Sequence, residues 1–147
     1  PQDLGSYATE GNFYFYQPKG VAVVIAPWNF PLAIACGMCA AAIVAGNTVV
    51  FKPSSQSLVV GHHLVEIFGE AGLPAGVFNF VSGPGSSVGN ALVDSLDVDG
   101  ITFTGSYDVG MHIYRTFAQG TYPRPLVLEM GGKNPSIVSR HAESLRT

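Results

Sequence analysis

A sequence of 147 residues, 47% of them hydrophobic, is long enough for one domain with a hydrophobic core. Only 12% of the residues are charged, about half of the usual ~25%, so we expect protein outside this sequence to cover part of the surface and the chain to be a fragment. The net charge of −3, with 7 lysines and arginines and no basic cluster, makes nucleic acid and anionic membranes poor partners.

Residues 1–19 are predicted to precede the main domain. Residues 1–11 are polar and contain glycine, which is typical of a loop. The aromatic residues 12–17 favour a strand that pairs outside the main sheet. The sequence Pro18-Lys19-Gly20 then predicts a turn.

The residues from Gly20 to Phe51 form an uncharged run. Its length would suit a membrane span, but Pro27 and Pro31 interrupt a continuous helix, and Asn29 would lack a partner in lipid. We therefore interpret the run as strand, helix and strand, with Pro31 at the first helical position. The apolar, mostly β-branched first strand is typical of a parallel strand covered on both faces. These elements are predicted at residues 21–25, 32–44 and 48–51.

Cys36 and Cys39, inside this predicted helix, have the Cys-x-x-Cys spacing of thiol–disulfide proteins. A reactive thiol of that kind sits at a helix N-terminus, whereas Cys36 lies more than a turn beyond Pro31, so we interpret both as buried, unreactive core residues. Two cysteines and no signal peptide predict a reducing compartment, the cytoplasm or, in a eukaryote, the mitochondrial matrix. No zinc site is supported, and we expect no metal.

Strands and helices continue to alternate along the rest of the chain. The further strands are predicted at residues 77–81, 101–104 and 126–130, and the further helices at residues 57–69, 87–94 and 106–118. This alternation predicts an α/β fold with a doubly wound, mostly parallel, five-stranded and Rossmann-like sheet. We place the main domain at residues 20–135 and the start of a following segment at residues 136–147.

Residues 83–89, Gly-Pro-Gly-Ser-Ser-Val-Gly, connect a predicted strand to a helix and allow three interpretations. They nearly match the dinucleotide fingerprint, with one residue too many before the last glycine. Their last five residues also spell Gly-x-Ser-x-Gly, the nucleophile elbow of esterases, with Ser87 as nucleophile and Asp97, Asp99 and His112 downstream, although no oxyanion loop is evident. A plain turn would need the same glycines. We favour a turn that also contacts a cofactor.

Polar residues gather at the carboxyl ends of the predicted strands, where open α/β sheets bind ligands. Trp28 and Asn29 follow the first strand, Lys52 ends the second and Glu129 is in the fifth. Ser106 opens a helix whose free N–H groups would attract phosphate. The alternatives are a solvated Lys52, a simple helix cap at Ser106 and a partnered structural Glu129.

Four motifs together resemble the aldehyde dehydrogenase superfamily, in order and in spacing, over about residues 13–135. They are Pro27-Trp28-Asn29-Phe30-Pro31, Gly46-Asn47-Thr48-Val49-Val50-Phe51-Lys52-Pro53-Ser54, Phe103-Thr104-Gly105-Ser106 and Leu128-Glu129-Met130-Gly131-Gly132-Lys133-Asn134-Pro135. Within the superfamily, the chain looks most like the 1-pyrroline-5-carboxylate dehydrogenases. This narrower resemblance rests on Phe13-Tyr14-Phe15-Tyr16, Gly83-Pro84-Gly85-Ser86 and Glu129-Met130-Gly131-Gly132-Lys133.

The resemblance implies NAD(P)-dependent oxidation of an aldehyde to a carboxylate, with L-glutamate 5-semialdehyde the expected substrate and succinate semialdehyde an alternative. In the family a cysteine attacks the aldehyde, the asparagine that is here Asn29 donates to the oxyanion, and the glutamate that is here Glu129 activates water. Lys52 would hold the adenosine ribose. The other implied cofactor contacts are Ile25, Ala26, Pro27, Trp28, Ser54, Ser55, Gly85, Ser86, Gly89, Phe103, Thr104, Gly105, Ser106, Val109, Glu129, Met130 and Gly131.

Two departures from the family pattern matter. No cysteine follows Glu129, where the family has its nucleophile, so we expect a cofactor-binding part that is inactive alone and needs the rest of the same enzyme. When complete, the enzyme is expected to be a homo-oligomer. Ser55 stands where many NAD-specific members have glutamate, which leaves NADP possible beside NAD. The open alternatives are a non-catalytic dinucleotide-binding module and a thiol–disulfide protein built on Cys36 and Cys39.

Overall fold

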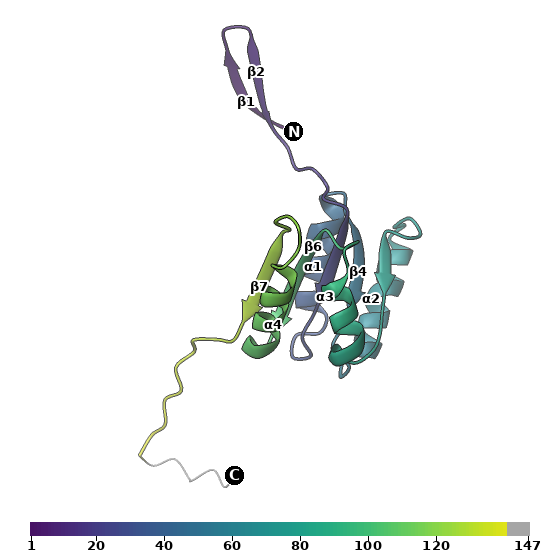
Figure 1. The fold of residues 1–147 in the computed structure, drawn as a ribbon, viewed down its shortest axis with the longest axis vertical. Helices are drawn as coiled ribbons and strands as arrows, with labels where there is room; N and C mark the ends of the chain where they lie inside the picture. Colours follow the sequence, from purple (N-terminus) through teal and green to yellow (C-terminus); the bar gives the residue numbers. More distant parts are fainter. Residues whose placement is uncertain (141–147) are drawn as a thin grey trace.

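The computed structural model describes residues 1–140, which form an α/β body with an extension at each end (Figure 1). The body contains a five-stranded parallel sheet with the strand order β5-β4-β3-β6-β7. The predicted five-stranded parallel sheet is therefore confirmed. The strands are β3 (Val21–Ile25), β4 (Thr48–Lys52), β5 (Phe78–Phe80), β6 (Gly100–Gly105) and β7 (Leu126–Met130).

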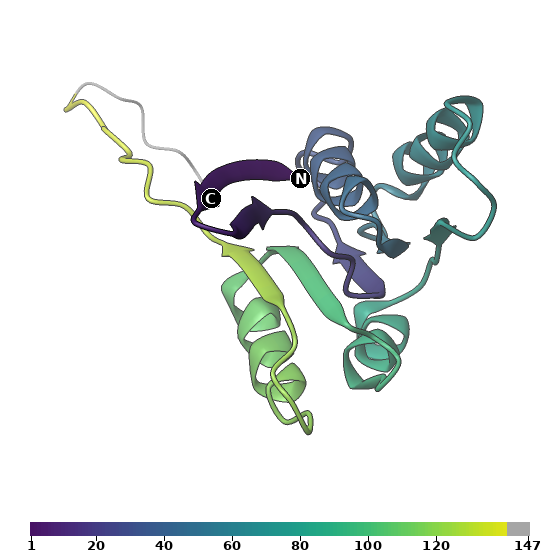
Figure 2. The ribbon, with the colours of Figure 1, turned by 90° about the horizontal axis from the view of Figure 1, so that it is seen from above.

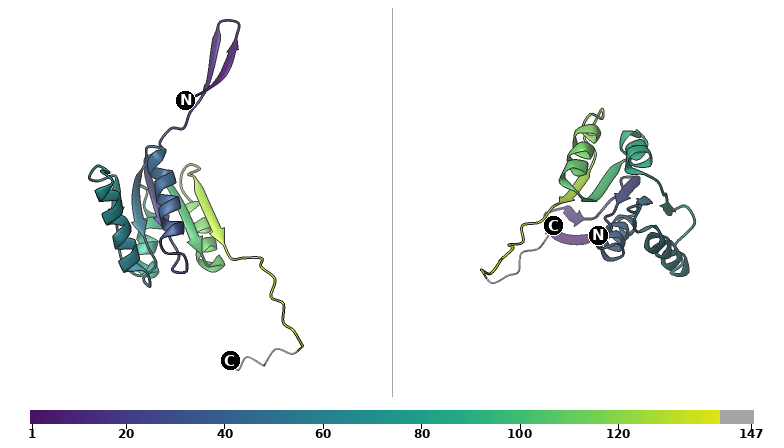
Figure 3. Two further views of the ribbon diagram at one scale, coloured as in Figure 1. Left: turned by 180° about the vertical axis from the view of Figure 1, so that it is seen from behind. Right: turned by 90° about the horizontal axis from the view of Figure 1, so that it is seen from below.

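Helices cover both faces of this sheet (Figures 2 and 3). Val24 of β3 packs with Ala35, Cys39 and Leu64 under α1 and α2, whereas its neighbour Val23 packs under α3 and α4. This alternation of side chains along one strand produces two separate hydrophobic clusters. The helical elements are α1 (Ala33–Val44), α2 (Leu58–Glu70), the π-helical turn η1 (Gly85–Gly89), α3 (Asn90–Asp94) and α4 (Tyr107–Phe117). Among residues 1–140, no helix is long and apolar enough to cross a membrane.

Side-chain carboxamide and carboxylate groups fix the amino end of β3. Asn47 Oδ1 accepts hydrogen bonds from the backbone N–H groups of Lys19 and Gly20, at 2.6 and 3.1 Å. Asp99 Oδ2 accepts one from Val21 N–H at 2.8 Å. Gly20 adopts φ 126°, a conformation that favours glycine. The start of β3 is thus joined to the segments that enter β4 and β6, which sets the register of the central strands.

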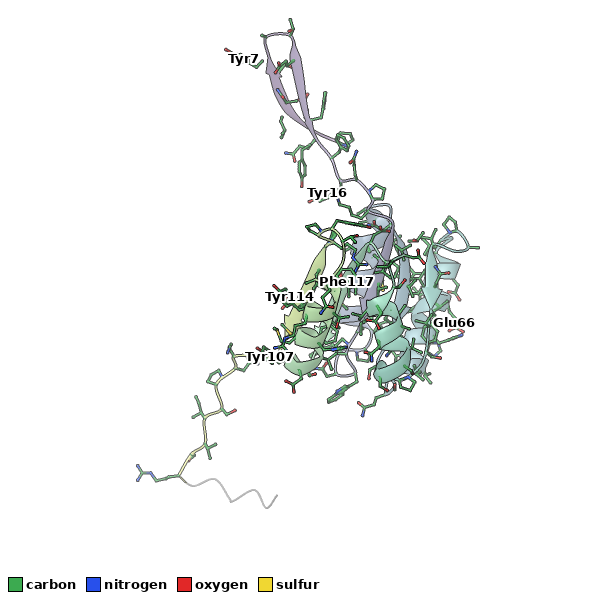
Figure 4. The ribbon with its side chains drawn as sticks, in the orientation of Figure 1. Tyr7, Tyr16, Glu66, Tyr107, Tyr114 and Phe117 are labelled. Carbon is green, nitrogen blue, oxygen red and sulfur yellow. The ribbon has the colours of Figure 1, made fainter. Side chains whose placement is uncertain are left out.

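The N-terminal segment differs from the prediction, because residues 1–11 are not a loop. β1 (Gln2–Tyr7) and β2 (Glu10–Tyr14) form an antiparallel hairpin that is a sheet of its own. The predicted strand over residues 12–17 ends at Tyr14. The connecting turn has Ala8 at φ 54°, and alanine gives no turn signal in the sequence. Tyr7 on the hairpin and Tyr16 just beyond it are 81% and 77% exposed and lie away from the helices (Figure 4).

Two predicted helix starts also need correction. The first helix begins at Ala33 with Leu32 as its N-cap, so Pro31 precedes the cap and is not the first helical residue. The bond from Ile34 N–H to the Phe30 carbonyl, at 3.3 Å, shows that the chain is already turning there. The helix predicted for residues 87–94 instead begins as η1 and continues as α3. Proline and glycine predict that a helix starts nearby, but the pairing of nearby carbonyls decides where.

Arg124 connects three segments at the amino end of β7, and we predict that its loss destabilises the fold. Its Nη1 donates to the carbonyls of Ser95 and Val98 at 3.0 and 2.8 Å, and its guanidinium lies 3.7 Å above the centre of the Phe117 ring. The substitution Arg124→Met should lower the free energy of unfolding by about 2 kcal/mol, because hydrogen-bonded carbonyls lose a charged donor. Denaturant unfolding would measure this. Arg115→Met, at an exposed site in the last turn of α4, should change it little; equal effects would contradict the bridging role of Arg124.

Candidate functional site

The main cavity lies at the carboxyl edge of the sheet and has a volume of about 960 Å³. Its walls come from the segment after β3, from α1, from the ends of β6 and β7 and from the first turn of α4. The strand order reverses between β3 and β6, and open α/β sheets bind ligands at such a reversal. Of the predicted site residues, the cavity brings together Pro27, Trp28, Asn29, Ser54, Phe103, Thr104, Gly105, Ser106, Val109, Glu129, Met130 and Gly131.

A second cavity, of about 430 Å³, lies between the end of β4, η1, α3 and α4. Val109 lines both cavities, so they adjoin at the first turn of α4. The second cavity is lined by the predicted residues Ile25, Lys52, Gly85, Ser86, Gly89 and Val109. Of the predicted set, Ala26 and Ser55 line neither cavity: Ala26 is buried in the cluster under α1 and α2, and Ser55 is exposed in the loop after β4.

Five residues of the second cavity were missed by the sequence reasoning. Asp108, His112 and Ile113 belong to one face of α4, and their spacing after a predicted helix start is a signal that could have found them. Asn90 and Val93 come from α3, and nothing in the sequence indicates that α3 faces α4. The five residues are Asn90, Val93, Asp108, His112 and Ile113.

Asn29 and Glu129 reach the main cavity from different parts of the chain. Asn29 is exposed in the segment between β3 and α1, and Glu129 is exposed on β7. Within residues 1–140, the Glu129 carboxylate makes no hydrogen bond or ion pair, so the alternative of a partnered structural glutamate is not found there. The carboxylate is available to a ligand or to water in the cavity.

Lys52 is buried at the end of β4, with 5% of its surface exposed, so the alternative of a solvated lysine is wrong. Burial lowers the pKa of its ammonium group below the usual range. Its Nζ donates one long hydrogen bond, 3.4 Å, to the carbonyl of Pro53. An ammonium has three donors, so as far as the described part of the chain is concerned Lys52 has donors left for the second cavity that it lines.

The first turn of α4 supplies backbone donors next to the main cavity. Ser106 is the N-cap, and its Oγ accepts from Val109 N–H at 3.4 Å, so the predicted cap is present. The N–H groups of Tyr107 and Asp108 precede the first residue that can bond within the helix and are left for another acceptor. Together with the helix dipole, they favour an anionic group between the two cavities. A helix start, a buried lysine and two adjoining cavities fit a dinucleotide.

Two alternative chemistries are not assembled. Cys39 is fully buried, and burial, with Cys36 nearby, raises the pKa of its thiol to about 12, so it is an inert core residue as predicted. Cys36, on the same helix, is only half-buried, so the prediction that both cysteines are buried is correct for Cys39 alone. The hydroxyl of Ser87 donates to the carbonyl of Pro84 at 3.4 Å, and His112 bonds Asn90 instead of Ser87, so the esterase arrangement does not form.

The aldehyde dehydrogenase family model matches residues 2–146. The chain belongs to the aldehyde dehydrogenase family. It is 48% identical over 139 residues to a 1-pyrroline-5-carboxylate dehydrogenase of Anoxybacillus flavithermus, covering 91% of this chain and 27% of that protein. The corresponding enzyme of Bacillus cereus is 49% identical over 138 residues, with the same coverage. The chain thus spans about a quarter of the length of the curated relatives it matches.

Solved structures agree with this membership. The structure of proline utilization A from Bdellovibrio bacteriovorus is similar with a TM-score of 0.83 and 47% identity, over 90% of this chain and 14% of that one. An NAD-dependent aldehyde dehydrogenase from Sinorhizobium meliloti gives a TM-score of 0.76 and 42% identity, over 81% of this chain and 23% of that one. Members of the family use NAD or NADP. The predicted family and fold are therefore confirmed.

We predict that Lys52→Met stabilises the ligand-free protein and weakens dinucleotide binding. The pKa of Lys52 is lower in the folded state than in the unfolded chain, so below the folded-state pKa the protonated amine destabilises the fold. This cost decreases as the pH rises from the folded-state pKa to the pKa of lysine in the unfolded chain. At neutral pH, the variant should therefore unfold at a higher denaturant concentration. It should bind NAD at least about tenfold more weakly, since it lacks a charged donor. Lys19→Met, at an exposed site, is the control for both measurements. A lower unfolding midpoint for Lys52→Met would contradict the cost of burial.

Proposed function

We propose that this chain is the cofactor-binding part of an enzyme that oxidises an aldehyde to a carboxylate with NAD, with NADP usable at reduced efficiency. The main support for this proposal is the pair of adjoining cavities at the strand reversal, with Asn29 and Glu129 lining the main cavity and Lys52 lining the second. The dinucleotide would extend across the first turn of α4. Its adenosine half would lie in the second cavity, and its nicotinamide half would lie in the main one.

Each residue then has a distinct task. Lys52 donates to the adenosine ribose, and the free N–H groups at the start of α4 bind the pyrophosphate. When bound, the dinucleotide accepts a hydride from the reacting carbon. Asn29 donates its side-chain N–H to the oxyanion that forms when a cysteine thiolate attacks the aldehyde. Glu129 removes a proton from the water that hydrolyses the resulting thioester.

The nucleophile must come from outside this chain. Its two cysteines, Cys36 and Cys39, both lie on α1 and therefore come before Glu129 in the sequence. The raised pKa of Cys39 keeps its thiol protonated at neutral pH. We therefore propose that residues 20–135 form the dinucleotide-binding domain, that residues 136–147 begin the following segment, and that the rest of the same enzyme supplies the cysteine. Residues 141–147 lie outside the described residues. We further propose that the complete enzyme is a homo-oligomer.

We propose L-glutamate 5-semialdehyde as the substrate. The support is the similarity to proteins named 1-pyrroline-5-carboxylate dehydrogenase and proline utilization A, at 47–49% identity in the comparisons above. The residues that line the main cavity include no lysine or arginine that could bind the substrate carboxylate, so we expect the rest of the enzyme to supply that group. An aldehyde screen of the full gene product should give the highest kcat/KM for glutamate semialdehyde. A preference for succinate semialdehyde would change the substrate but leave the proposed oxidation intact.

The function is tested by replacing Glu129 and Asn29 in the full gene product. Glu129→Gln should give a rapid burst of NADH followed by slow turnover, because the thioester forms but is not hydrolysed. Asn29→Ala should lower kcat by about 10²–10³ with little effect on NAD affinity. Pre-steady-state absorbance measures the first, and steady-state kinetics with NAD titration measures the second.

Glu66→Gln, on the exposed face of α2, makes the same chemical change as Glu129→Gln away from both cavities and should behave like the wild type. Full turnover by the Glu129→Gln enzyme would show that another group is the base. The chain of residues 1–147 alone should produce no NADH from semialdehydes, and a measurable rate would mean that the nucleophile has been misplaced. A full gene product that binds NAD but oxidises no aldehyde would favour a non-catalytic module.

Ser55 is proposed to decide how well NADP is used. It lies three residues beyond Lys52 in an exposed loop, and as a small neutral residue it should tolerate a 2′-phosphate. Ser55→Glu should reduce the efficiency with NADP far more than that with NAD, because two negative charges ~4 Å apart cost up to about 4 kcal/mol before solvent screening. The ratio of kcat/KM for the two cofactors is the measurement, with Ser6→Glu on β1 as control. An equal loss with both cofactors would place Ser55 away from the ribose.

A further inference from the structure

We propose that the second cavity selects adenine over oxo-purines, because Asp108 and His112 present hydrogen-bond acceptors to the edge of the base and Asn90 fixes the proton position on His112. The inference rests on the proposed function, which places the adenosine half of the dinucleotide in this cavity. It adds residues that read the base, beyond those that hold the ribose and the pyrophosphate.

The second cavity has apolar walls and a polar rim. Val93 of α3 and Val109 and Ile113 of α4 supply hydrocarbon surface, which suits the two faces of a flat heterocycle. Asp108 and His112 are four residues apart on α4 and therefore lie on one face of that helix. A base held between α3 and α4 would meet these two polar side chains along its edge.

A chain of two hydrogen bonds determines which nitrogen of His112 carries the proton. Asn90 Nδ2 donates to the backbone carbonyl of Ser86 at 3.1 Å. The amide orientation is thereby set, and Asn90 Oδ1, which can only accept, lies 3.1 Å from His112 Nε2. Neutral His112 must donate from Nε2, which leaves Nδ1 as an acceptor. Asn90 is in this sense a positioning residue for His112.

The α4 side of the rim is consequently rich in acceptors. An ionised Asp108 can only accept, and His112 in the tautomer set by Asn90 can only accept through Nδ1. Adenine carries an exocyclic amine with two donors at the position where hypoxanthine carries a carbonyl oxygen. The amine can donate to both side chains, whereas hypoxanthine offers one donor on this edge, N1–H, and its carbonyl would face the other acceptor without a hydrogen between them. Because Asp108 and His112 are exposed, we expect a preference of about tenfold and not the larger values of enclosed sites.

The test compares NAD with nicotinamide hypoxanthine dinucleotide in equilibrium titrations of the full gene product. The two molecules differ only in the base, so the contacts of their nicotinamide, ribose and pyrophosphate groups cancel in the ratio of their two dissociation constants. The wild type should bind NAD about tenfold more tightly. His112→Phe keeps the flat ring but removes the acceptor, and the ratio should fall toward one through weaker NAD binding.

Two further variants separate base reading from a structural effect. Asn90→Leu removes the hydrogen bond that keeps the proton on His112 Nε2, so that Nδ1 can also carry it and donate. Asp108→Asn introduces a donor. Each should tighten binding of the hypoxanthine dinucleotide while weakening that of NAD. A merely structural defect would weaken both. His63→Phe is the matched control, since His63 is exposed on α2 beside Glu66 and outside the cavity, and it should leave the ratio unchanged.

The outcomes distinguish this inference from the proposed function. Equal affinities of the wild type for the two dinucleotides would overturn the inference while leaving NAD binding intact. Failure of the wild type to bind either one would overturn both. A ratio near ten that persists in His112→Phe, Asn90→Leu and Asp108→Asn would show that other groups read the base.

Discussion

The position of β3 between β4 and β6 is the constraint on which the rest of the structure depends. Val23 and Val24 have no exposed surface, because one faces the helices α3 and α4 and the other faces α1 and α2. After β3 and β4 the chain crosses one face of the sheet, and after β6 it crosses the other. The segments that leave β3 and β6 therefore diverge and open the main cavity between them. Asn29 and Ser106 occupy those two segments, so the same core that stabilises the fold also places them.

Lys52 shows a conflict between stability and binding. Residues 49–51 of the same strand are apolar and pack in the core. The lysine ends that strand, and within the described residues 1–140 its buried amine is bonded only to a carbonyl 3.4 Å away. A methyl-terminated side chain of similar length would satisfy the core better. The ligand-free protein thus carries an unfavourable group at the floor of the second cavity, and a hydroxyl-bearing ligand would remove part of that cost. Such an arrangement is typical of a binding residue.

The sequence predicted the parallel sheet well, because its strands are continuous apolar runs whose burial on both faces leaves little choice of structure. It failed at β1, where Ala8 adopts a positive φ without the usual turn residues. The motifs located the edge of the sheet but not its division into two cavities. Ser54 lines the main cavity, while Lys52, two residues earlier, lines the second. Asn90 and His112 meet only because α3 packs beside α4, and that contact depends on tertiary structure, which local spacing does not encode.

The exposure of the proposed catalytic groups explains why the proposed activity needs more than a nucleophile. Trp28 is 63% exposed, and Asn29 and Glu129 are exposed as well. An amide that donates to an oxyanion contributes most where water is excluded, because the effective dielectric constant is lower there. In this chain, water has free access to the main cavity, so Asn29 would compete with solvent for the same charge. Only 12% of the residues are charged, which is also expected if other protein covers part of the surface of this chain. We therefore infer that the part of the proposed enzyme that supplies the cysteine also closes the main cavity, so that an external thiol alone would not restore the activity.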